Sequence, residues 1–311
     1  MNPAFKPVPI TKLPLLPVME ILSSMDPARL FSLSCCSKKA KSLVKFVTRK
    51  VVAQYRVGAS FNYKCVIRFE PKNKRPRNYH VRLPEHSNSK AASLAAIRRA
   101  QNVMDQILNL FHSMKIRGHF FFDLHGQRGK AIFDWARLHK DSLEQVVYSG
   151  RISKHRNVQK FLDTFTNCQL ANIRTQTKAN FVRVHPIEIE TLIIKHGRWF
   201  TMENLRNFKG KDVRILDSRL TNADVNQFLK DWRSGTWSNP YLHTVYIERD
   251  DTDVPLILHD IPHTTHAVHP DRELFNSIGV WYWVESDDRS RVAKMYRSKK
   301  SDKDNIGIKF Y

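Results

Sequence analysis

The second half of the chain repeats a short apolar segment followed by a helix-like segment, and this alternation constrains the fold more than any other feature. The strand-like cores are centred on Val147, Asn172, Ile193, Ile215 and Val245, at intervals of 25, 21, 22 and 30 residues. Helix-like connectors occupy residues 157–165, 202–208 and 222–232. A repeated strand-plus-helix unit predicts an irregular solenoid over about 143–250.

Units of twenty to thirty residues with one strand and one helix are typical of leucine-rich repeats, so we expect a leucine-rich-repeat-like arrangement. Strand and helix patterns also alternate before this region, with strands at 60–69, 79–83 and 118–124 and helices at 90–114 and 131–139. Terminal strands are expected at 280–284 and 306–311. The fold class is therefore α/β (α+β), with one domain over 58–311.

Composition indicates a folded protein, because 41% of the residues are hydrophobic and 26% are charged. No apolar stretch is long enough to span a bilayer, so no membrane association is expected. The four cysteines form neither a disulfide framework nor a zinc-site spacing, which favours a cytoplasmic or nuclear location.

The net charge of +23 is uneven, with 26 basic and 9 acidic residues in the first 150. The densest basic patch consists of Lys72, Lys74, Arg75 and Arg77. A phosphate-binding loop and a solvated hairpin tip both fit this patch. Because no zinc finger or RNA-binding aromatic signature accompanies it, we do not expect specific nucleic-acid binding. A basic nucleic-acid-binding protein remains the alternative function.

Three short helices are predicted between Leu13 and Val47. Apolar residues recur at helical spacing from Val18 to Met25, Asp26 and Pro27 begin a second helix, and Ser37 can cap a third. Helices this short do not bury enough surface to be stable alone. Part of their apolar surface should therefore face a partner or the rest of the chain.

The order of these residues resembles that of an F-box over 10–50. The resemblance is carried by Leu13-Pro14, Ile21-Leu22, Met25-Asp26-Pro27, Leu30-Phe31 and the Cys36-Ser37-Lys38-Lys39 ending, which is similar to nematode-type F-boxes. Leu16 and Ala40 depart from the commonest pattern, which has an acidic residue and a tryptophan there. The resemblance implies binding to a Skp-family adaptor of a cullin–RING ubiquitin ligase through Leu13, Pro14, Val18, Ile21, Leu22, Met25, Pro27, Leu30 and Phe31.

A second resemblance lies in the segment from Leu220 to Trp232 with the following Asn239-Pro240-Tyr241-Leu242. It is similar to the F-box-associated domain that accompanies nematode-type F-boxes. The residues themselves predict a helix capped by Thr221 or Asn222, with Val225, Phe228, Leu229 and Trp232 buried. Together, the two resemblances imply a substrate-recognition adaptor of an SCF-type ligase whose C-terminal domain binds a protein substrate.

Catalytic and metal motifs are missing from the sequence. The histidines at 259, 263, 266 and 269 lie in a proline-containing loop without a cysteine and are interpreted as a surface cluster, and Cys168 has no recognisable partner. We therefore expect a non-catalytic protein with no cofactor and no metal site.

Charged side chains on the predicted repeat strands mark a candidate substrate surface. Lys195, Arg198, Arg214 and Arg219 should point outward, beside core-facing Leu192, Ile194, Ile215 and Leu216. These cations would attract an acidic protein partner, although charged faces often serve only solubility.

Overall fold

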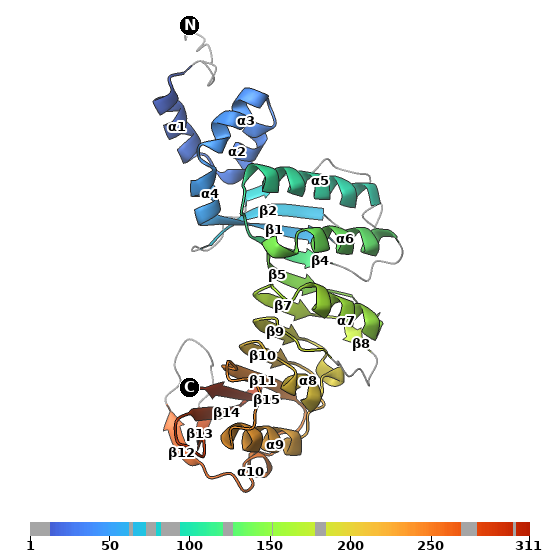
Figure 1. The fold of residues 1–311 in the computed structure, drawn as a ribbon, viewed down its shortest axis with the longest axis vertical. Helices are drawn as coiled ribbons and strands as arrows, with labels where there is room; N and C mark the ends of the chain where they lie inside the picture. Colours follow the sequence, from blue (N-terminus) through green and yellow to red (C-terminus); the bar gives the residue numbers. More distant parts are fainter. Residues whose placement is uncertain are drawn as a thin grey trace. The chain divides into compact units, whose positions relative to one another are not determined.

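The computed structural model describes residues 13–61, 65–72, 79–81, 94–120, 127–150, 152–177, 185–268, 279–300 and 303–311. The chain forms two compact units, one ending at Glu144 and the other beginning at Gln145. Figure 1 shows the helices and strands of both units. We describe each unit separately.

The first unit begins with the helices α1 (Leu15–Ser24), α2 (Pro27–Ser34), α3 (Lys38–Lys45) and α4 (Thr48–Gln54). The expected capping is confirmed, because the Asp26 carboxylate accepts the Arg29 N–H at 2.9 Å and the Ser37 hydroxyl accepts the Ala40 N–H at 3.0 Å. Helix α4 was not predicted from the sequence. Helix α2 packs against strands β2 and β3 of the same unit, which provides part of the burial that such short helices need.

A four-stranded sheet in the order β4-β1-β2-β3 follows in the first unit. Its elements are β1 (Tyr55–Phe61), β2 (Cys65–Pro71), β3 (Tyr79–Val81), α5 (Leu94–Leu110), β4 (Ile116–Phe120) and α6 (Gln127–Leu138). The strand predicted at 60–69 is thus two antiparallel strands, paired from Tyr55 opposite Pro71 to Phe61 opposite Cys65. Phe61 and Phe120 contact Trp135 of α6, and Phe69 contacts Phe111, so the helices cover one face of the sheet.

The second unit begins with a parallel sheet whose strands follow the order of the chain. Strands β5, β7, β9, β10 and β11 pair in succession, each parallel to the one before. The helical segments between them lie together on one side of the strands in Figure 1. The short helix η2 (Lys140–Ser142) belongs to the first unit. The elements from there on are β5 (Leu143–Tyr148), β6 (Ile152–Ser153), α7 (His155–Thr164), β7 (Leu170–Ile173), β8 (Gln176–Thr177), β9 (Thr191–Ile194), η3 (Gly197–Trp199), α8 (Met202–Arg206), β10 (Asp212–Ile215), α9 (Asn222–Arg233) and β11 (Thr244–Arg249).

The strand cores predicted at 145–148, 170–173, 192–194, 213–216 and 243–247 all coincide with observed strands. A parallel, sequentially ordered sheet with helical connectors agrees with the mixed α/β class. Its description as leucine-rich-repeat-like stays a prediction. A separate short sheet pairs β6 with β8.

The remaining strands continue the sheet in antiparallel fashion. Strand β15 (Lys303–Phe310) pairs with β11 and β14 (Val292–Lys300), and β13 (Gly279–Glu285) pairs with β14 and β12 (Thr264–Val268). A short helix, α10 (Val254–Ile257), precedes them. The sequence predicted β13 and β15 but missed β12 and β14. Strand β14 carries four Lys or Arg residues among nine, so the pattern lacked a continuous apolar face.

Helix α9 is built as its sequence predicts. The Thr221 hydroxyl accepts the Asp224 N–H at 3.1 Å, and the Asp224 carboxylate accepts the Thr221 N–H at 2.7 Å, which forms a capping box. Val225, Phe228, Leu229 and Trp232 are all buried. Phe228 and Trp232 also contact Phe310 of β15, so this helix joins the parallel and antiparallel parts of the sheet.

Candidate functional site

The F-box-like helices form a small core from most of the residues that the sequence analysis assigned to adaptor binding. Val18, Leu22, Leu30 and Phe31 are 2%, 0%, 0% and 7% exposed, and Pro27 is also buried. Ala40 and Val44 of α3 complete the core. These five residues, which the sequence analysis assigned to adaptor binding, therefore lie beneath the solvent-exposed surface of the helices.

The other residues of that assignment lie at the surface. Pro14 and Ile21 are exposed, the latter at 40%, whereas Leu13 and Met25 are half-buried. Leu15 and Leu16, which the sequence analysis did not assign, are 54% and 78% exposed. The run Leu13-Pro14-Leu15-Leu16 could have indicated that some of these side chains are exposed, because four consecutive apolar residues exceed what one helix face can bury. Phe46, exposed at 61%, is a further apolar side chain at the end of α3.

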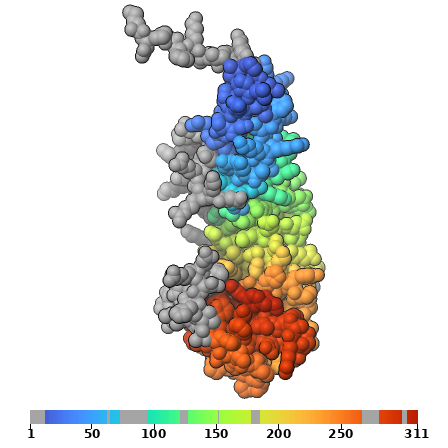
Figure 2. All heavy atoms as spheres, turned by 90° about the vertical axis from the view of Figure 1, so that its left-hand side faces the viewer, coloured from blue at the N-terminus to red at the C-terminus, as the bar shows by residue number. Residues whose placement is uncertain are grey.

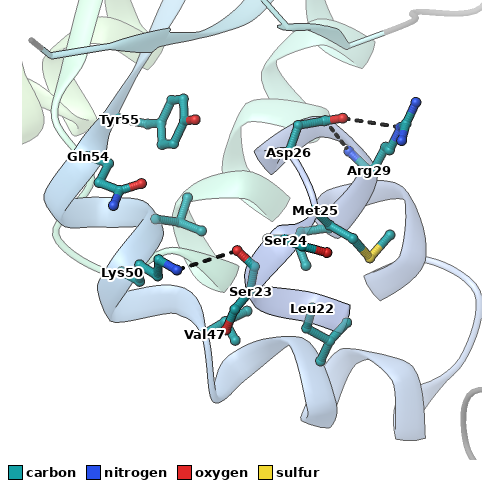
Figure 3. A pocket seen from close by; sticks show the side chains of 12 residues that line it. Leu22, Ser23, Ser24, Met25, Asp26, Arg29, Val47, Lys50, Gln54 and Tyr55 are labelled. Atoms are coloured by element: carbon teal, nitrogen blue, oxygen red, sulfur yellow. Dashed lines mark hydrogen bonds and ion pairs between the residues drawn. The ribbon is translucent and has the colours of Figure 1, made fainter. Parts of the chain in front are cut away.

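A pocket of about 290 Å³ lies among the end of α1, the start of α2 and helix α4. Figure 3 shows Met25 beside this pocket, with Lys50 directed toward Ser23. The Lys50 ammonium donates to the Ser23 carbonyl at 3.5 Å, and Arg29 pairs with Asp26 at 3.1 Å. These polar contacts tie α4 to α1 and order the start of α2, so the pocket wall is fixed relative to the exposed face of α1.

Among the predicted cationic residues, Arg214 lies on the helix-free face of the second unit, where it alternates with buried Val213 and Ile215. Lys195, Arg198 and Arg219 lie in the segments that follow β9 and β10. Lys195, Arg214 and Arg219 are exposed, as expected. Arg198 is exposed as well, but its guanidinium pairs with Asp217 at 3.1 Å, which leaves it less available to a partner. Leu192, Ile194 and Ile215 are buried, whereas Leu216 follows the end of β10 and is only half-buried.

Aromatic side chains continue this face beyond Arg214. The strand register places Arg214 beside Tyr246, Tyr246 beside Gly307, Gly307 beside Tyr296 and Tyr296 beside Trp281. Figure 2 shows the second unit, coloured from green to red, from the left-hand side of Figure 1. Sequence reasoning did not connect these residues because β14 was not predicted, and its pairing with β15 depends on strand register between separate segments.

The basic patch between β2 and β3 lies largely outside the described residues. Lys72 is described, and its ammonium donates to the Val52 carbonyl at 2.9 Å. Lys74, Arg75 and Arg77 fall outside the described ranges, as does His269 of the histidine cluster. Among the described residues no group of three His, Cys, Asp or Glu could hold a metal ion, and no helix there is long and apolar enough to cross a membrane.

The cysteines differ sharply in accessibility, which gives a simple prediction. Burial raises the pKa of the Cys65 thiol to about 11 and that of Cys168 to about 12, from an ordinary value of 9.0. Because the thiolate is the reactive form, these two thiols should react at least about 10-fold more slowly at pH 8 than an unshifted thiol, once the higher nucleophilicity of a more basic thiolate is included. Cys35 and Cys36 are exposed. A colorimetric thiol titration should show two fast thiols, and four fast thiols would contradict the buried positions.

Comparison with known proteins finds one matching segment in each of the two units. An F-box domain model matches residues 10–51, and a model described as F-box associated matches residues 180–247. The chain is also similar to the Skn-1 dependent zygotic transcript 15 protein of Caenorhabditis elegans, with 23% identity over 85% of this chain and 87% of that protein. No solved structure matches significantly. The resemblance to a nematode-type F-box protein with a C-terminal F-box-associated domain is thereby confirmed.

Proposed function

We propose that this chain, which carries an F-box and an F-box-associated region, is a non-catalytic substrate-recognition subunit of an SCF-type cullin–RING ubiquitin ligase. The F-box binds a Skp-family adaptor, and the unit beginning at Gln145 binds a protein substrate. Acting in the cytoplasm or nucleus, such a subunit raises the local concentration of substrate near a ubiquitin-loaded enzyme without breaking bonds itself.

The observation that carries this proposal is the exposed apolar surface of α1. Leu15, Leu16 and Ile21 are exposed on a helix whose Val18 and Leu22 are buried in the F-box core. Apolar side chains gathered on one short helix indicate a protein contact. The adaptor surface therefore consists of Pro14, Leu15, Leu16 and Ile21, with Leu13 and Met25 at its edge and Val18, Leu22, Pro27, Leu30 and Phe31 beneath it.

Substrate capture is proposed for the helix-free face of the second unit, which includes Arg214, and for its rim at the ends of β9 and β10, where Lys195, Arg198 and Arg219 lie. The support for this is the open face itself, since helices cover only the opposite side of the parallel strands. Sheet faces made by successive strands provide extended binding surfaces.

Replacing Pro14 and Ile21 together by alanine tests the adaptor assignment. Each truncation removes about 1 kcal/mol of apolar contact, so the dissociation constant for a purified Skp-family adaptor should rise about 10- to 100-fold. Binding is measured by calorimetry on the full chain, with the melting temperature as a check on folding.

The matched control is Leu138→Ala, which shortens a 77%-exposed leucine on α6, outside the F-box. The control should bind the adaptor like the parent chain. Undiminished binding by the double variant, at an unchanged melting temperature, would remove the F-box surface from the proposal.

A further inference from the structure

Two lysines face each other on the helix-free side of the antiparallel strands. Lys294 of β14 and Lys309 of β15 are directly paired in the strand register, and both are half-buried. Like charges opposite each other on neighbouring strands destabilise a sheet. Within the described residues, no ion pair joins either ammonium to a carboxylate. The pair therefore costs stability that no ion pair within the described residues offsets.

The carboxylates on the same face are held at a distance by the register. Asp212 shares the row of Lys309 but is two strands away, across Thr244, at about 10 Å. Glu248 is engaged by Lys303 at 3.7 Å. Glu285, opposite Val292, lies diagonal to Lys294 and is exposed to solvent. The positive potential around Lys294 and Lys309 is therefore only partly compensated.

Aromatic rings hold the Lys294 ammonium in place. Its Nζ atom lies 4.3 Å from the ring centroid of Trp283 and 4.6 Å from that of Tyr311. The His266 ring packs on Trp283 at 4.1 Å between centroids. Cation–π contacts orient a cation while leaving it able to bind an anion. The half-buried lysine is thus fixed in position without being neutralised.

A second aromatic pair extends the same surface toward Arg214. The Trp281 and Tyr296 rings lie 4.7 Å apart, and the Tyr296 ring lies across Gly307, where any side chain would collide with it. Burial raises the pKa of both Tyr296 and Tyr246, so their hydroxyls stay neutral and add no negative charge. The face thus combines flat apolar rings with three cations, Arg214, Lys294 and Lys309.

We infer that this aromatic–cationic face, formed by Arg214, Tyr246, Trp281, Trp283, Lys294, Lys309 and Tyr311, binds an acidic protein segment in extended conformation. Charge complementarity argues for the acidic character, because the unrelieved lysine pair gains most from an anionic partner. The spread of the residues over β10, β11, β13, β14 and β15 argues for an extended segment rather than a single anion. The inference rests on the proposed substrate-binding role and identifies its anchor and substrate class.

The test uses the full chain and a fluorescein-labelled hexaglutamate peptide, with hexaglutamine as the uncharged peptide. Replacing Lys294 and Lys309 together by glutamine should weaken hexaglutamate binding at least tenfold at low salt, whereas hexaglutamine should bind neither protein. Because Trp281 and Trp283 belong to the face, hexaglutamate should also change the tryptophan emission of the parent chain. Binding of hexaglutamate by the variant with parental affinity would overturn the inference.

The matched control removes two exposed cations, Lys154 and Arg156, at the start of α7 on the helix side of the unit. The variant with both replaced by glutamine has the same net charge as the test variant, and its affinity for hexaglutamate should fall less than twofold. An equal loss of hexaglutamate affinity in the test variant and in the control variant would mean that only the net charge of the chain attracts the peptide. A dT oligonucleotide that binds more tightly than hexaglutamate, with the same dependence on Lys294 and Lys309, would assign the face to nucleic acid instead.

Stability separates a binding role from a structural one. The single change Lys309→Gln removes the like-charge repulsion and keeps the Lys294 contacts with Trp283 and Tyr311, so the melting temperature should stay level or rise while peptide binding falls. A lower melting temperature would indicate that the lysine pair serves the fold. The peptide assays need no Skp-family adaptor. A negative result with the Pro14 and Ile21 double variant therefore has no bearing on the peptide assays, and a negative peptide assay has no bearing on adaptor binding.

Discussion

Replacement of Glu70 by glutamine is expected to lower the free energy of unfolding of the first unit by about 1–3 kcal/mol, because it removes the carboxylate shared by three neighbouring arginines, of which, among the described residues, only Arg56 keeps another partner, Glu144 at 3.1 Å. The Glu70 side chain is 8% exposed and lies within 2.6 Å of Arg68, 3.4 Å of Arg117 and 3.8 Å of Arg56. Arg68 and Arg117 are more than one-third exposed and can turn toward water, which favours the lower end of the range. Urea denaturation followed by circular dichroism measures the change.

Glu20→Gln provides the control, because this glutamate is exposed on α1 and its loss should change stability by less than about 0.5 kcal/mol. The Glu70 carboxylate also covers Gly58, where a side chain would collide with it. Adding Arg68→Gln to Glu70→Gln should recover part of the lost stability by removing one unpaired charge. A denaturation midpoint equal to that of the parent chain would show that the arginines do not depend on Glu70.

Shortening Leu30 to alanine is expected to unfold the F-box at temperatures where the second unit stays folded. Leu30 is 0% exposed at the centre of helices too short to be stable alone. Removing its side chain should cost about 2–5 kcal/mol, a large part of the stability of a small helical cluster. Hydrogen-exchange mass spectrometry should show faster exchange in α1, α2 and α3 and unchanged exchange in β9, β10 and β11.

Leu16→Ala is the matched control for this change. Leu16 is 78% exposed, so the same chemical truncation should leave F-box exchange rates unchanged while weakening adaptor binding. Parental exchange rates in the Leu30→Ala protein would mean that the F-box core does not depend on this leucine. The pair distinguishes residues of the proposed adaptor surface from residues that support it.

The local order of the F-box was predictable from sequence because its signals act over a few residues. Asp26-Pro27 and Ser37 begin helices through contacts with N–H groups three residues away, and Val18 and Leu22 repeat at the helical period. The same holds for α9, where Thr221, Asp224 and the stripe from Val225 to Trp232 suffice to predict the cap and the buried face. The repeat strands were predictable for a similar reason, since parallel strands buried under helices appear as short apolar runs.

Tertiary structure alone decided which residues are available to partners. Periodicity could not separate Ile21, which is exposed, from Leu22, which is fully buried, because both are apolar and adjacent. Tertiary burial of one side of α1 makes that choice. Nor could the sequence bring Lys294 beside Lys309 or Trp283 beside Tyr311, since strand register depends on pairing between separate segments. The sequence alone was enough to predict α1, α2, α3 and α9, the parallel strands and the F-box order, but not α4, β12 or β14. Strand pairing and helix packing determined the exposed surfaces, because burial depends on contacts among segments distant in the chain.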